Sequence, residues 1–294
     1  MKRSIFIGLG LLAVAGTLLA QQSVTVIDSS RTAVDYMVEV YKKENIPFKA
    51  PIPLPYVREA DVLQEWTVWR MVMLTEKQNL ELYYPTAPIG GRVNLVNLLL
   101  RGVENGEITA YDPNDEYNEF SRKITMAEID QNFGAKTDTI DVADEYGNLT
   151  RQVREVGRKT DEIKRLLIKE KIYFDKKHSV LNFQVIGICP IRVYMRDGAD
   201  FDAKPDMQKT MWIYMPEARN ILARHPVFNR FNDAQNISFD DFFMQNRYSG
   251  MIYRVSNVYN NRDIQEYASG LDALYEAQRI QDDIFDWEQD LWEY

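Results

Sequence analysis

Cysteine and histidine are nearly absent from this chain. Its 294 residues include one cysteine and two histidines. A lone cysteine forms no disulfide within the chain, so the fold must be held by its core or by partners. The two histidines, His178 and His225, offer little for a histidine-based metal site, which normally takes two or three clustered ligands. We expect both histidines at the surface, and Cys189, inside an apolar run, as a small buried hydrophobic residue.

Sequence motifs of common active sites are missing as well. The chain has no G-x-S-x-G elbow, Walker loop, dinucleotide fingerprint or H-E-x-x-H motif. Acidic stretches from Asp112 and from Asp141 fail as calcium loops, since Tyr117 and Tyr146 stand where glycine is needed. We therefore expect no catalytic residues, no metal site and no cofactor. A carboxylate pair for glycoside hydrolysis stays open as an alternative, because 44 acidic residues always supply candidates.

Basic residues are outnumbered by acidic ones, 35 to 44, for a net charge of −9. Lys2 and Arg3 precede an apolar run over residues 5–19, which predicts a secretory signal peptide cut after Ala20. A retained membrane anchor is the alternative, because the run is near the lower limit for spanning. Without the leader, 33 basic and 44 acidic side chains leave a charge near −11, which argues against nucleic-acid binding. We expect an exported, soluble protein.

The stretch over residues 171–224 is the strongest structural signal. A short apolar run over 180–193, rich in β-branched residues, predicts a buried strand, and Pro190 predicts a bend, bulge or edge near its end. Residues 211–214 are expected to form the returning strand. Pro216 then opens a helix, because its fixed φ suits the first helical position.

Apolar spacing and caps predict the other elements. Over residues 58–78 apolar side chains recur at spacings of four, three and four, which predicts a helix with one apolar face. These side chains are Val62, Trp66, Trp69 and Met73. Further helices are expected at 93–103, 125–134, from 160 into the central strand, and at 239–247; strands are expected at 80–84, 107–111 and 250–255.

Short strands and short helices interleave without a regular β-α alternation, which predicts an α+β fold with antiparallel strands. We expect a signal peptide over 1–20 and a mobile N-terminal segment with a proline-rich arm over 21–57. A first α+β unit is expected over 58–134. A polar connection or solvent-facing hairpin follows over 135–159, and a second α+β unit with a C-terminal helix over 160–294.

Two segments are expected to bind partners. Prolines make residues 46–56 stiff and extended, so that this arm lies either on its own domain or on a neighbouring subunit. Its candidate contact residues are Pro51, Pro53 and Pro55. The acidic helix over 271–294 carries an apolar seam, with candidate contact residues Ile280, Ile284, Trp287, Leu291 and Trp292. The alternative is that this helix packs on its own domain.

A series of short segments, in order along the chain, resembles one known family. In the C-terminal half they are Trp212-Ile-Tyr-Met-Pro-Glu-Ala-Arg219, Phe239-Asp-Asp-Phe-Phe243 and the tail from Gly270 to Tyr294. In the first half they are Arg58-Glu-Ala-Asp-Val62 and Gly106-Glu-Ile-Thr-Ala-Tyr111. From about residue 55 to residue 294, the chain is similar to the GldN/PorN family of Bacteroidetes gliding-motility and type IX secretion proteins.

This resemblance implies a non-enzymatic component of the periplasm, at the inner face of the outer membrane. It implies three partners: a ring lipoprotein (GldK/PorK), the periplasmic domain of an inner-membrane motor protein (GldM/PorM), and further copies of the chain in a ring. The family has no catalytic motif to carry over. The competing hypothesis is a periplasmic carbohydrate-active or envelope-modifying enzyme, which should survive as a monomer and lose activity on a single Asp or Glu change.

Overall fold

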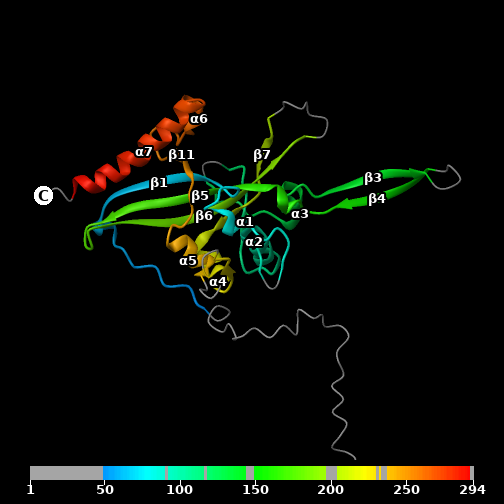
Figure 1. Cartoon of the computed structure of the whole chain (residues 1–294), viewed down its shortest axis with the longest axis horizontal. Coiled ribbons are helices and arrows are strands. Elements are labelled where there is room, and N and C mark those ends of the chain that lie inside the picture. Colours follow the sequence, from blue (N-terminus) through cyan, green and yellow to red (C-terminus); the bar gives the residue numbers. More distant parts are fainter. Residues whose placement is uncertain are drawn as a thin grey trace, which may run out of the picture. The chain divides into compact units, whose positions relative to one another are not determined.

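A seven-stranded antiparallel sheet organises the fold (Figure 1). The computed structural model describes residues 49–89, 92–115, 118–143, 149–196, 204–229, 232 and 237–291. The strand order is β11-β1-β5-β6-β8-β2, and β7 also pairs with β6. These strands are β1 (Val62–Met73), β2 (Ala110–Tyr111), β5 (Ile163–Asp175), β6 (Val180–Tyr194), β7 (Asp206–Lys209), β8 (Trp212–Tyr214) and β11 (Met251–Val255).

Two small sheets and seven helices complete the part of the chain that the structure describes. The small sheets pair β3 (Lys136–Ala143) with β4 (Leu149–Val156), and β9 (Pro226–Val227) with β10 (Ile237–Ser238). The helices are α1 (Leu80–Tyr83), α2 (Leu95–Glu104), α3 (Met126–Asn132), α4 (Met215–Ala223), α5 (Phe239–Met244), α6 (Ile264–Tyr267) and α7 (Leu271–Asp290). The fold is α+β, as the sequence predicts.

Local signals fix several of these helices. Capping boxes that begin at Thr125 and at Ser238 start α3 and α5, as expected. Pro216 lies in the first turn of α4, where it loses no hydrogen bond. Gly106, just beyond α2, has a φ of 73°, the left-handed conformation that follows many helix ends. Here local chemistry and final structure agree.

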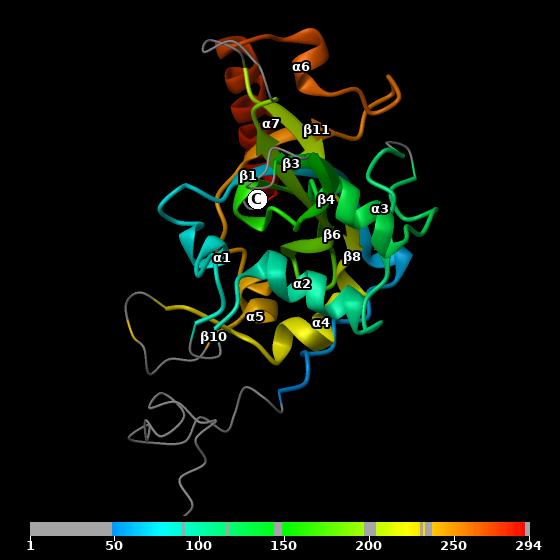
Figure 2. The same ribbon diagram turned by 90° about the vertical axis from the view of Figure 1, so that its right-hand side faces the viewer.

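The helices form two groups around the large sheet. Figure 2 shows α2, α4 and α5 below it and α6 and α7 above it. The lower group shares the main core with the sheet, whereas α7 covers a second core that includes Val68 and Ile172. Val68 and Val72 lie four residues apart on one side of β1, yet Val72 belongs to the main core. Because long strands have a right-handed twist, one side of β1 can face α7 at Val68 and the lower helices at Val72.

The helix predicted over 58–78 is wrong, because residues 62–73 within it form strand β1. In a strand, the spacing that suggested a helix places Trp66 and Trp69 on opposite sides. Trp66 packs in the core under α7, and Trp69 packs with Leu167 and Trp212. The strand is rich in valine and tryptophan, and their preference for a pleated surface prevails over the apparent helical period.

Three further predictions need correction. The helix expected from residue 160 is one 3-10 turn, Thr160–Glu162, followed by strand β5. The charged residues that made β5 hard to predict as a strand are paired. Glu170 forms an ion pair with Arg70, and Lys169 forms one with Glu119. Residues 80–83, expected to be a strand, form the short helix α1. The two expected α+β units are also not separate, since β1 lies between β5 and β11 in one sheet.

Pro190 marks the point where β6 changes neighbours. β6 pairs with β8 at Gly187 and Ile188, and with β7 from Ile191 to Tyr194. The carbonyl of Pro190 accepts the N–H of Thr210 at 3.0 Å. The missing N–H of proline therefore falls between two ladders, as expected for a bend or edge. Strands β3 and β4 pair antiparallel, in agreement with the solvent-facing hairpin that was one of the two arrangements expected there.

Candidate functional site

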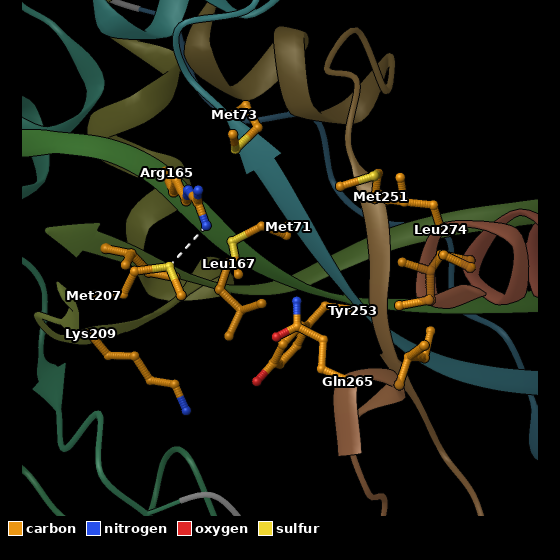
Figure 3. A pocket seen from close by; sticks show the side chains of 15 residues that line it. Met71, Met73, Arg165, Leu167, Met207, Lys209, Met251, Tyr253, Gln265 and Leu274 are labelled. Carbon is orange, nitrogen blue, oxygen red and sulfur yellow. Dashed lines mark hydrogen bonds between the residues drawn. The ribbon is translucent and has the colours of Figure 1, made fainter. Parts of the chain in front are cut away.

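An apolar groove of about 450 Å³ opens on the large sheet (Figure 3). We call it the methionine groove. Strands β1, β5, β6, β7 and β11 and helices α6 and α7 all contribute to its lining. Its four methionines are Met71, Met73, Met207 and Met251.

Strand register places the floor of the groove in two adjacent rows. In one row Met71 pairs with Met251 on β11 and with Leu167 on β5. In the next row Arg165 pairs with Met73 on β1 and with Ile191 on β6. Alternate residues of a strand share a face, so these rows form one continuous surface across neighbouring strands.

The rim of the groove is open to solvent. Met207 is 54% exposed and Met251 is 47% exposed, and Leu274 of α7 is 45% exposed. A guanidinium nitrogen of Arg165, Nη1, lies 2.9 Å from the sulfur of Met207. Flexible thioethers adapt to differently shaped apolar partners. The groove is therefore suited to bind a mostly apolar segment.

The seam of α7 is buried against its own sheet. Ile280 and Ile284 are 9% and 4% exposed, and Leu291 packs in the same cluster. The indole of Trp287 lies edge-on to Trp66, with ring centroids 5.2 Å apart. The alternative that this helix packs on its own domain is the one that the structure shows. The seam therefore packs within the chain, and partner binding at these four residues stays a prediction. Trp292 lies outside the described residues.

The described part of the proline-rich arm also lies on its own domain. Lys49 forms an ion pair with Asp241 of α5. The backbone carbonyl of Ile52 accepts a hydrogen bond from Arg219 Nη2 at 2.5 Å. Pro51 is half-buried, while Pro53 and Pro55 are exposed. The contacts that the structure shows for this arm are thus made within the chain.

The buried carboxylates of the described residues are each held by a basic side chain. The pairs are Asp112 with Arg122, Glu119 with Lys169, Glu170 with Arg70, Asp175 with His178, Asp240 with Arg219, and Asp263 with Arg254. A glycosidase needs one protonated and one ionised carboxyl group facing its substrate. Pairing with arginine or lysine favours the ionised form instead, although at Glu170 burial outweighs the pairing. Because each of these carboxylates is held by a side chain of its own chain, they fit a structural role.

Glu170 has the most enclosed of these carboxylates. Its Oε1 accepts hydrogen bonds from Arg70 Nε at 3.1 Å and from the hydroxyl of Tyr248 at 3.0 Å. Burial raises the pKa of Glu170, and burial together with this carboxylate raises the pKa of Tyr248 well above its usual value. Arg70 also reaches the carbonyl of Gly250, so the cluster ties β1 and β5 to the start of β11.

The residues considered for metal binding or nucleophilic chemistry are dispersed. His178 is exposed beside Asp175, and His225 is half-buried with Nδ1 2.9 Å from the carbonyl of Ile221. Cys189 is fully buried and not in a disulfide, and burial raises its thiol pKa to about 12. Across the described ranges, no three His, Cys, Asp or Glu side chains gather as metal ligands. None of the helices in those ranges is long and apolar enough to cross a membrane.

The methionine groove was not predicted from the sequence. Its signal was available, because Met71 and Met73 alternate with Arg70 and Val72, as residues on one side of a strand do. The apparent helical spacing of the apolar residues in the same segment hides that alternation.

Residues 57–293 match the family model described as gliding motility associated protein GldN. No curated protein matches the chain.

Proposed function

Because the chain belongs to the GldN family of gliding-motility-associated proteins, we propose that it is a non-enzymatic subunit of a periplasmic ring complex. The ring serves type IX protein secretion and gliding motility at the inner face of the outer membrane. In it the chain binds a ring lipoprotein, the periplasmic domain of an inner-membrane motor protein, and further copies of itself.

The methionine groove is the observation that carries this proposal. A subunit that works by binding needs an apolar surface that its own fold leaves uncovered. The groove offers one on paired strands, whose positions are fixed by the sheet, with flexible methionine side chains at the rim. The pairing of Glu119 with Lys169 and of Asp240 with Arg219 supports the same proposal, since it holds these buried carboxylates in contacts within the chain.

Substitutions at the groove rim test the proposal. Met207→Asp and Met251→Asp place a charge on the exposed rim, and Met244→Asp is the matched control, because Met244 is 42% exposed and lies outside the groove. Tagged variants are purified from envelopes in mild detergent and imaged by electron microscopy. We expect rings that contain a lipoprotein from the unaltered chain and from the control, and at least about tenfold less from the rim variants.

Two results would contradict the proposal. If the rim variants assemble as well as the control, the groove takes no part in assembly. A single-chain particle that survives gentle extraction and cleaves an envelope polysaccharide would support the enzyme alternative. Loss of that cleavage on one Asp or Glu substitution would establish it.

A further inference from the structure

The outer face of α7 carries an unbroken acidic row. Asp282, Asp286 and Asp290 are exposed and follow one another at intervals of four residues. Residues at this spacing lie one above another on a helix. We call these three residues the acidic row.

The acidic row is unfavourable for the helix that carries it. Like charges four residues apart destabilise a helix. Carboxylates near a helix C-terminus also face the negative end of the helix dipole, and the last turn of α7 has no basic residue. Local rules are broken in this way where a surface serves a purpose other than folding.

A basic pocket of about 540 Å³ lies where the β3–β4 hairpin leaves the fold. Its lining has four basic side chains and no acidic one. Next to the lining, Glu162 pairs with Lys159 and Arg192, and Asp206 pairs with Arg196, so the cations outnumber these carboxylates by two. The basic residues are Lys136, Lys159, Arg192 and Arg196. Such a pocket is unexpected on a chain with net charge −9.

Arg192 is fixed in the wall of this pocket. Its Nε donates to Glu162 Oε2 at 2.6 Å, and its guanidinium lies 4.1 Å from the ring centroid of Tyr194. Gly134 makes room for it, because a Cβ there would lie 2.3 Å from Arg192 Nη1. Arg192 is only 6% exposed, so a charged group is held in place at the pocket.

The acidic row and the basic pocket lie at opposite ends of strand β6. Leu181 packs in the cluster under α7 with Ile284 and Trp287, whereas Arg192 lines the pocket eleven residues further along. At about 3.3 Å per residue, a strand separates these ends by about 36 Å. A paired strand is stiff, so the two surfaces of one chain cannot meet.

We infer that the acidic row of one copy of this chain docks into the basic pocket of a second copy. Each copy then uses a different surface toward each neighbour, and such head-to-tail contacts close into rings when the rotation permits. This inference deepens the proposed function, on which it rests, by naming one contact between identical subunits.

Charge reversal in two separate variants tests the contact. One variant carries Asp282→Lys and Asp286→Lys, and the other carries Lys136→Glu and Arg196→Glu, all at exposed positions. Arg192 is left intact because it is buried. Asp272→Lys, on the first turn of α7, and Arg247→Glu, in the loop after α5, are exposed controls away from both surfaces. The measurement is the mass of the purified protein by light scattering across a concentration series.

Each charge-reversed variant alone should self-associate at least about tenfold more weakly than the unaltered chain, since like charges then face each other. Mixing the two variants should restore association, because the basic row of one meets the acidic pocket of the other. The controls should behave as the unaltered chain. Raising the salt from about 0.1 M to about 1 M shortens the screening length from about 10 Å to about 3 Å and should weaken association.

Three results would overturn the inference: an unaltered chain that stays monomeric at every concentration, variants that associate as well as the controls, or a mixture that does not recover. The outcome is separable from that of the proposed function. If self-association depends on these charges but envelopes yield no ring that contains a lipoprotein, the contact between copies is supported and the proposed ring is contradicted.

Discussion

The indole of Trp287 meets the indole of Trp66 edge-on, with centroids 5.2 Å apart and ring planes at 81°. Phe174 also lies edge-on to Trp287, with ring centroids 5.5 Å apart. These three rings join α7 to β1 and β5. The C-terminal helix is therefore part of the core.

Replacing Trp287 by alanine should destabilise the protein by about 3 kcal/mol, because it removes aromatic contacts and leaves a cavity. Tyr275→Ala is the control on the same helix; Tyr275 is 70% exposed, and its loss should change stability by less than about 0.5 kcal/mol. Urea unfolding measures both. Equal midpoints for the two variants would show that the ring cluster adds nothing to stability.

Arg70 and Glu170 should behave as one unit. Arg70→Leu or Glu170→Leu alone should cost about 3–5 kcal/mol, because each leaves a buried charge without its partner. The double variant should cost less than either single one. A double-mutant cycle from urea unfolding tests this, and costs that simply add would exclude the coupling.

The raised pKa of Glu170 should also appear in the pH dependence of stability. Burial makes the folded state hold this proton more tightly than the unfolded state, where the pKa is about 4.3. Its contribution is fully present below that value and is lost as the pH rises through the folded pKa. In Glu170→Gln this decline should disappear from the curve of unfolding free energy against pH. Parallel curves for the two proteins would refute the assignment.

Cys189 should be inert in the folded protein. Burial raises its thiol pKa to about 12, so very little thiolate exists near neutral pH. An aromatic disulfide reagent at pH 8 should label one thiol in urea, and in native buffer react at least about a hundredfold more slowly. Rapid native labelling would show that β6 opens readily.

Gly134 and Gly106 offer a matched pair, with φ angles of 78° and 73°. Alanine at either position is strained by about 1–2 kcal/mol. At Gly106 a Cβ meets nothing within 4 Å, whereas at Gly134 it collides with Arg192. Gly134→Ala should therefore lower the melting temperature more than Gly106→Ala. The difference measures how firmly the Arg192 guanidinium is held, and equal shifts would mean that it moves freely.

The sequence predicted the elements that local chemistry determines. The capping boxes at Thr125 and Ser238, the helix after Pro216 and the apolar strand around Val185 all formed as expected. The family resemblance is confirmed over residues 57–293. The elements could be predicted from a few neighbouring residues, and the family from the order of short segments along the chain.

Predictions from the sequence failed where contacts with distant residues determine the secondary structure. Lys169 and Glu170 suit a central strand only because Glu119 and Arg70, far along the chain, neutralise them. The spacing of the α7 seam predicted its helix correctly. It could not predict whether the apolar side of that helix packs on a partner or on the chain's own sheet. The groove required knowing which strands are neighbours, and short-range patterns do not contain that information.

The position of β1 has a consequence for how the protein folds. Residues 68–71, near the start of the described chain, pair with residues 251–255, near its end. Contacts between residues so far apart slow folding, because the long loop must close before the pairing can stabilise it. The sheet therefore stays incomplete until β11 has been synthesised. A chain lacking β11 and α7 should stay only partly folded, open to proteases and to chaperones that hold unfolded polypeptides.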